Sequence, residues 1–189
     1  MKKRSLALLL ALVLAIGVAA GGTIAWLVAQ TDSVVNTFTY GDINITLTET
    51  TGSSYKIIPG VDITKDPKVT VKANSEACWL FVKVAEENWP TFAEADGTPK
   101  VTYTIADGWT ELTAGSGVYY RAVAATTTAD VDFYVLKDNK ITVSENLTKA
   151  EVNGIKTQPT LTFTAYAVQK DGIATAAAAW EKANPTTTP

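Results

Sequence analysis

The chain has 189 residues, with 16 Lys and Arg against 19 Asp and Glu, one cysteine and no histidine. A chain without histidine has no imidazole base, which excludes Ser-His-Asp and Cys-His nucleophile pairs and the HExxH zinc helix. Its single cysteine, Cys78, excludes an intrachain disulfide and a four-cysteine zinc site. The length and the apolar content of 47% are typical of one globular domain. We therefore expect a protein that is not an enzyme, with no catalytic or metal-binding residues and no cofactor.

The first residues have the pattern of a secretory signal peptide. Residues 2–4 form a positive cluster, and an uncharged run rich in Leu, Ala and Val extends over residues 5–30. A pair of glycines interrupts this run just before two small residues, Thr23 and Ala25. Small residues at this spacing predict a signal-peptidase site between Ala25 and Trp26.

The same uncharged run allows two alternatives. Its length of about 25 residues is sufficient to span a bilayer as a retained anchor, and a second cleavage site follows Ala29. Cleavage after Ala25 removes three positive charges, so 13 positive and 19 negative side chains leave a net charge of −6. Such a chain is not expected to bind nucleic acid. We expect a protein secreted to the extracellular matrix or the cell surface, with membrane contact only before cleavage.

Beyond residue 30 the sequence changes to the period-two alternation of half-buried strands. The first predicted strand runs from Phe38 to Leu47, with a bulge at Gly41-Asp42. Val, Thr, Tyr and Phe dominate the other windows, which are residues 69–71, 79–84, 101–105, 118–124, 131–136, 141–143 and 160–169. Many short strands predict an all-β fold, a jelly-roll-like β-sandwich with short helical insertions and a short C-terminal helix.

Turn and cap residues divide these windows. Asp138-Asn139 predicts a hairpin turn between residues 131–136 and 141–143. Residues 86–95 predict an irregular or helical insertion. Ser144 or Thr148 would cap a short helix that ends near Val152, and Thr175 would cap an alanine-rich helix that ends at Asn184-Pro185. The predicted layout is a signal peptide (1–25), an N-terminal linker or donor-strand segment (26–37), the sandwich domain (38–183) and a tail (184–189).

Three blocks of the sequence match a family pattern. They are Gly21-Gly22-Thr23 followed by Asn36-x-Phe38-x-x-Gly41 and a strand ending at Glu49; Pro59-Gly60 followed by Lys65-Asp66-Pro67 and Val69-Thr70-Val71; and residues 158–169 followed by 177–180. Together these blocks resemble the TasA/camelysin-like family of secreted proteins with a SipW-type signal peptide. The resemblance marks Asn36, Phe38, Gly41, Pro59 and Gly60 as family-motif residues.

The resemblance implies a jelly-roll domain that polymerises into extracellular fibres of the biofilm matrix. Each subunit would lend its N-terminal segment as a strand to a neighbouring copy, and the donor-strand candidates are Trp26, Val28, Val34 and Val35. These residues have no hairpin partner nearby, so addition to an open sheet edge would satisfy their backbone. The implied partners are the chain itself as a homopolymer, a SipW-type signal peptidase during export, and a minor fibre subunit or anchoring protein.

A monomeric cell-surface binding or adhesion module is the alternative function. Its carbohydrate-stacking platform would use Trp79, Trp89, Trp109, Trp180, Tyr103, Tyr119 and Tyr120, although their dispersal in the sequence favours packing within the sandwich. The metalloprotease activity attributed to some camelysin-like proteins is not expected, because zinc proteases need histidine ligands.

Other reactive side chains have simpler interpretations. Asp130 and Asp132 favour a charged, exposed sheet edge over a catalytic pair. The stretch 94–97 favours a solvated loop over a calcium site, because it lacks the spacing of an EF-hand. Cys78 favours a buried apolar side chain over a nucleophile, since no imidazolium can lower its pKa.

Overall fold

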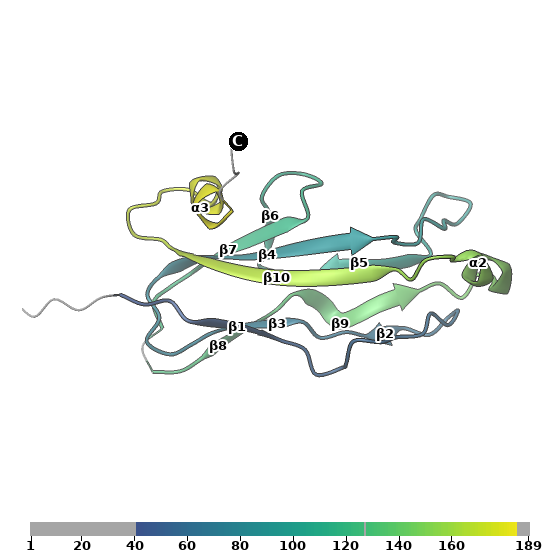
Figure 1. Ribbon diagram of the computed structural model, residues 1–189, viewed down its shortest axis with the longest axis horizontal. Coiled ribbons are helices and arrows are strands. Elements are labelled where there is room, and N and C mark those ends of the chain that lie inside the picture. The colour runs from purple at the N-terminus through teal and green to yellow at the C-terminus, as the bar shows by residue number, and fades with distance from the viewer. Residues whose placement is uncertain (1–40, 127, 185–189) are drawn as a thin grey trace, which may run out of the picture. The chain divides into compact units, whose positions relative to one another are not determined.

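The computed structural model describes residues 41–126 and 128–184, which belong to one compact unit (Figure 1). The predicted cleavage site at Thr23, Ala25 and Trp26 lies outside these residues. So do the donor-strand candidates Trp26, Val28, Val34 and Val35 and the motif residues Asn36 and Phe38. In the described part of the chain, neither helix is long and apolar enough to cross a membrane.

The described residues form ten strands and two short helices. In chain order they are β1 (Ile45–Thr48), β2 (Ile63–Thr64), β3 (Lys68–Val71), β4 (Cys78–Glu87), β5 (Val101–Ile105), β6 (Thr110–Glu111), β7 (Val118–Val123), β8 (Val131–Tyr134), β9 (Leu136–Val143), α2 (Lys149–Gly154), β10 (Thr160–Gln169) and α3 (Ala176–Ala183). All strand pairs are antiparallel. The predicted all-β, jelly-roll-like sandwich with short helices is confirmed.

The strands form two facing layers. One layer is a sheet in the order β10-β4-β7-β6, and the other contains the sheets β1-β3-β8 and β2-β9-β5. Backbone hydrogen bonds join these last two sheets, from Lys65 N to Asn139 O (2.7 Å) and from Val135 N to Pro67 O (2.9 Å). The second layer is therefore continuous, because β2 and β3 follow each other end to end, as do β8 and β9 (Figure 1). The pairing of β5 with β9 adds the last strand of this layer.

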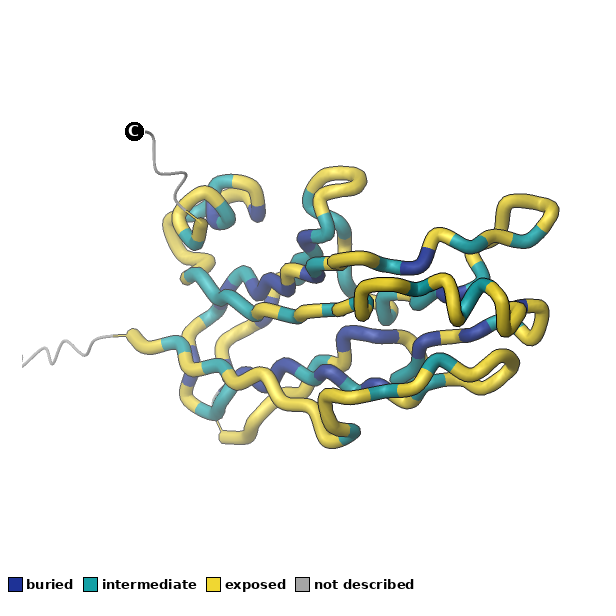
Figure 2. The backbone as a smooth tube through the Cα atoms, turned by 45° about the vertical axis from the view of Figure 1, so that its right-hand side comes forward, coloured by how far each residue is buried: buried dark blue, intermediate teal, exposed yellow. Residues whose placement is uncertain are grey.

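The alternation of side chains places the core between these layers. Leu80 and Val82 on one face of β4 pack against Val69 and Val71 of β3, and all four are fully buried. Phe81 points to the opposite face of β4, where α3 covers it. Buried and exposed positions accordingly alternate along several strands (Figure 2). Period-two burial is thus the main determinant of the fold.

The two helices begin where their caps predict. Thr148 Oγ1 accepts from Glu151 N (3.2 Å), and Glu151 Oε2 accepts from Thr148 N (2.7 Å), which completes a capping box for α2. Thr175 Oγ1 accepts from Ala178 N (3.2 Å) at the start of α3. Both caps are local interactions and were therefore predictable from sequence; of the two α2 candidates, the cap is Thr148 and not Ser144.

The first strand is shorter than predicted. Residues 38–40 of the predicted strand lie outside the described residues, and among those described the strand begins only at Ile45. Its partner strand β3 ends at Val71, and a turn with Asn74 at φ 63° follows. Residues 42–44 therefore bond to turn atoms, and Asn44 N donates to Ser75 Oγ (3.1 Å).

The predicted insertion at residues 86–95 is also wrong in part. Glu86 and Glu87 continue β4, because they pair with Leu161 and Thr160 of β10. The strand ends at Glu87, the next residue Asn88 has φ 52°, and residues 88–95 form a loop without a helix.

The hairpin predicted at Asp138-Asn139 does not form. Both residues have positive φ, 54° and 52°, as a tight turn would require. However, β8 pairs with β3 and β9 pairs with β2 and β5, so the chain continues from one strand into the other. The two residues lie in a bulge between the pairs Ile105–Leu136 and Tyr103–Ile141.

Acid should destabilise the fold through two carboxylates. The hydroxyl and amide of Thr50 hydrogen-bond Asp66 and lower its pKa to about 2, and the Thr148 amide and Lys100 lower the pKa of Glu151 to about 2. Because both folded-state pKa values lie below the unfolded ones, this stability is present above about pH 4.5 and is lost as the pH falls toward 2. Thermal melts of wild type and of D66N/E151Q should converge at pH 2. A gap that persists there would contradict this.

Candidate functional site

The family-motif residues that the structure describes lie in two separate places. A Cβ at Gly41 would lie 2.8 Å from Glu76 Cγ, so glycine allows close approach of two chain segments near β1. Gly60 has φ 74° and donates its N–H to Ser144 O (3.2 Å) near α2. Pro59-Gly60 is therefore a turn, and Gly41 and Gly60 do not come together in one site.

One side of the sandwich has an open edge at β8. Val131 and Phe133 lie opposite Val71 and Val69 of β3, so their side chains point between the layers like those of their partners. Val71 is fully buried, whereas Val131 is 38% exposed. An inward-facing valine with this exposure indicates that nothing within the described residues covers the core at this position.

A cavity of about 420 Å³ lies beside this edge. Its walls come from the end of β7, the start of β8 and the residues next to them, and most are apolar. They are Ala122, Val123, Ala124, Ala125, Thr126, Thr128, Ala129, Val131 and Phe133. We call this opening the edge groove.

The backbone beside the edge groove has unpaired hydrogen-bonding groups. The bond from Val135 N to Pro67 O sets the alternation of β8, so that Val131 and Phe133 bond toward β3 and Asp132 bonds outward. Within the described residues no strand pairs with that outer edge, because β5 covers β9 only. The indole Nε1 of Trp109 donates to Tyr134 O (2.9 Å) and closes one end. The groove thus offers edge backbone and an apolar floor.

Two exposed ion pairs flank the edge. Lys68 Nζ lies 2.7 Å from Asp132 Oδ2, and Lys72 Nζ lies 2.9 Å from Asp130 Oδ2. These hydrogen bonds lower the pKa of both carboxylates. The prediction of a charged, exposed sheet edge at Asp130 and Asp132 is confirmed. Exposed pairs of this kind contribute little stability.

The opposite side of the sandwich contains a buried lysine. Lys65 follows the inward-facing Ile63, and its side chain is only 7% exposed. Its Nζ donates to Glu49 Oε1 (2.6 Å) and lies 4.9 Å from the ring centre of Tyr55 and 5.5 Å from that of Phe163. This side also has a cavity of about 390 Å³. On this side the edge strands of the two layers, β1 and β10, contact each other.

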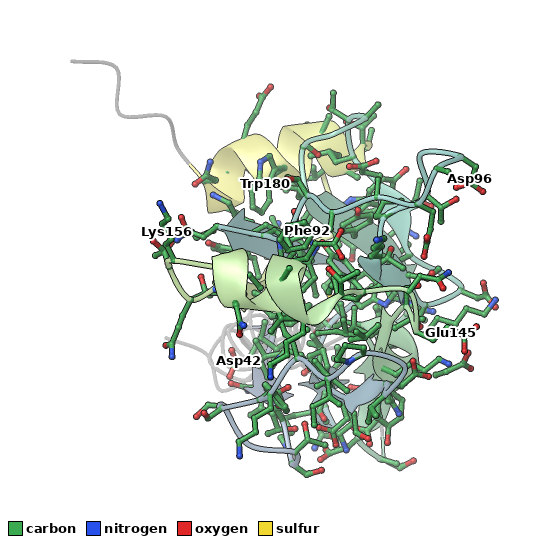
Figure 3. All side chains as sticks on the ribbon, turned by 90° about the vertical axis from the view of Figure 1, so that its right-hand side faces the viewer. Asp42, Phe92, Asp96, Glu145, Lys156 and Trp180 are labelled. Carbon is green, nitrogen blue, oxygen red and sulfur yellow. The ribbon has the colours of Figure 1, made fainter. Side chains whose placement is uncertain are left out.

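The predicted aromatic platform is divided among several places. Trp79, Tyr120 and Trp180 pack around Phe81 beneath α3, and Figure 3 shows Trp180 between this helix and the sheet. The preference for core packing over an exposed platform is confirmed for these rings, but they pack on the outer face of the sheet and not between the layers. Trp109 lies over Arg121, at 5.3 Å from its Cζ. No sequence pattern predicts this division, because it depends on which face of which strand each ring occupies.

A third hollow, of about 760 Å³, includes the remaining rings, Trp89, Tyr103 and Tyr119, together with Glu86. Trp89 and Tyr103 make an edge-to-face contact at 5.7 Å. The Tyr103 hydroxyl donates to Glu86 Oε1 (2.7 Å), and burial together with this bond raises the pKa of Tyr103. The hollow is therefore a shallow aromatic surface with one carboxylate.

The other reactive side chains among the described residues have structural surroundings and do not form a reactive site. Among the described residues, no three Asp, Glu or Cys side chains come together as a metal site would require. Cys78 is fully buried, and burial raises the pKa of its thiol to about 11, which confirms it as a buried apolar side chain. Asp96 and Glu145 lie at the periphery (Figure 3), and Asp96 Oδ1 accepts from Thr98 N (3.0 Å) within its own loop.

Comparisons of the chain with protein-family models, with curated proteins and with solved structures found no match. The TasA/camelysin-like resemblance of the sequence therefore stays a prediction. The edge groove is the candidate site that follows from the geometry alone.

Proposed function

We propose that the protein is a secreted structural subunit that assembles into extracellular matrix fibres. Each copy would donate residues 26–37 to the edge groove of a neighbouring copy. One observation carries the proposal: Val131 points into the core of the sandwich and is nevertheless 38% exposed. A strand laid beside β8 would bury this valine and pair the outward backbone groups of Asp132.

The groove and the proposed donor have matching chemistry. The floor is formed mainly by alanine, valine and phenylalanine side chains. The donor-strand candidates Trp26, Val28, Val34 and Val35 supply apolar side chains in a segment without a hairpin partner. Burial of alternate apolar residues and backbone pairing along the edge would together stabilise the contact.

The course of the chain into β1 favours donation to a neighbour. Lys72 N donates to Asn44 O (2.8 Å), and Glu76 N donates to Asp42 O (2.9 Å), so residues 42–44 run on beside the turn that follows β3. In the sheet order β1-β3-β8 this entry lies on the far side of β3 from β8. Insertion into the groove of its own chain would require the segment to reverse and cross two strands.

Export would control assembly. An uncleaved leader would hold residues 26–37 next to the membrane, and a SipW-type signal peptidase would release them. The partners would be further copies of the chain and a minor subunit or anchoring protein. The function would be structural, without catalysis.

Deletion of residues 26–35 tests the proposal. Mature protein that starts at Trp26 should form filaments in electron microscopy, and the deleted protein should be a folded monomer in size-exclusion chromatography. Circular dichroism of both proteins provides the control for folding. Filaments of normal length from the deleted protein would contradict strand donation.

A monomeric glycan-binding module is the second candidate function. The observation that favours it is the hollow with Trp89, Tyr103 and Tyr119, since aromatic faces and one carboxylate suit sugar rings. This function predicts that the mature protein stays monomeric at high concentration. It also predicts that W89A abolishes binding on a glycan array, whereas W109A does not.

A further inference from the structure

The edge groove borders an arginine that has no acidic partner. Arg121 lies on β7 opposite Leu80, so its side chain points between the layers with those of Tyr119 and Val123. None of the ion pairs among the described residues includes Arg121. Its Nε is buried and has no hydrogen-bond partner there. A cation in this position is costly unless a carboxylate compensates it.

Aromatic rings hold the guanidinium at the groove. Its Cζ lies 4.1 Å from the ring centre of Phe133, a residue of the groove floor, and 5.3 Å from that of Trp109. A Cβ at Gly108 would lie 3.0 Å from Arg121 Nη2, so the loop also confines this side. Burial lowers the pKa of Arg121, but an arginine remains charged at neutral pH. The charge is thus fixed in place and uncompensated.

The proposed donor segment has one charged side chain. Between Trp26 and Tyr40 that residue is Asp32. In an extended strand alternate residues share a face, which puts Asp32 on the same face as Trp26, Val28 and Val34. If this apolar face enters the sandwich, Asp32 enters with it. An isolated carboxylate would then be buried near the partly buried Arg121, whose Nε has no hydrogen-bond partner among the described residues.

We propose that Arg121 of one copy binds the carboxylate of Asp32 of the next copy when the donor segment occupies the edge groove. This inference rests on the proposed function. Each charge compensates the other, and the planar guanidinium can bind both carboxylate oxygens. The pair would also specify the register of the donor strand, because a slip by one residue moves Asp32 to the opposite face.

Charge reversal in mature protein tests the pairing. D32K alone and R121E alone should each raise the critical concentration for assembly by at least about a hundredfold, because each leaves unmatched charges in the interface. An equimolar mixture of the two proteins should form filaments again. In the mixture each donor meets an acceptor of opposite charge, and alternating copolymers result. Sedimentation and electron microscopy provide the readout.

Two controls support the interpretation. The double variant D171K/R121E should not assemble, because a lysine at the exposed position 171 restores the net charge of the chain outside the proposed interface. If R121E fails to fold by circular dichroism, D32N and S33N keep the test valid, since Ser33 is on the opposite face of the donor strand. D32N should raise the critical concentration at least about tenfold, and S33N should leave it unchanged.

The possible failures are distinguishable. Wild-type protein that does not form filaments would contradict the proposed function itself. Wild-type filaments together with normal assembly of D32K or D32N would overturn the pairing and leave strand donation standing. Folded R121E that fails to assemble with D32K would likewise overturn it.

Discussion

Replacing Val131 with glutamate should abolish fibre formation and leave the monomer folded. The wild-type side chain is 38% exposed in the groove, so a carboxylate there can reach water before assembly. An inserted donor strand would bury that charge without a partner, which costs several kcal/mol. We expect a rise in the critical concentration of at least about a hundredfold.

The matched control for V131E is V61E. Val61 is another exposed valine, at 51%, and it lies in the loop before β2 and not in the groove. V61E should assemble like wild type, and both variants should melt within a few degrees of it. Normal fibres from V131E would mean that the groove is not an assembly surface.

Removing the charge of Glu49 should have the largest effect on stability. E49Q leaves the Lys65 ammonium in the core with two aromatic rings but no carboxylate. Breaking a buried ion pair from one side costs about 3 kcal/mol, since the remaining charge is uncompensated. Chemical denaturation of the mature protein measures this loss.

The companion variant K65M distinguishes loss of the Glu49–Lys65 ion pair from burial of an unpaired lysine charge. Methionine has a similar length and is apolar, so K65M should be within about 1 kcal/mol of wild type. The double variant E49Q/K65M should recover most of the stability that E49Q loses. If E49Q and K65M are equally destabilising, hydrogen bonding and packing of the lysine matter more than its charge.

The sequence predicts those parts of the fold that depend on local interactions. Thr148 and Glu151 form a capping box three residues apart, and Thr175 caps α3 in the same way. Period-two alternation identifies the longer strands, because inward residues pack against the opposite layer and alternate along the strand with outward ones. The two-residue strands β2 and β6 are too short for such a pattern. Asp138-Asn139 has turn-like residues in a bulge, which only the pairing of β8 and β9 reveals.

The edge groove was beyond prediction from sequence, because it depends on contacts distant in the chain. Val131 has the same alternation as buried Val71, and only the sheet order shows that one of them is at an edge. The period-two alternation of β7 does predict that Arg121 faces inward, like Tyr119 and Val123. Its lack of a partner, however, depends on side chains from β8 and the loop after β5. The sequence does contain the proposed donor segment, which lies outside the described residues.

A cryo-EM structure of fibres grown from mature protein tests the central claim most directly. The account predicts residues 26–37 of one copy as a strand beside β8 of the next copy, with Val131 buried and Asp32 next to Arg121. Fibres whose subunits touch elsewhere and leave the groove empty would contradict it. So would a groove that each chain fills with its own segment.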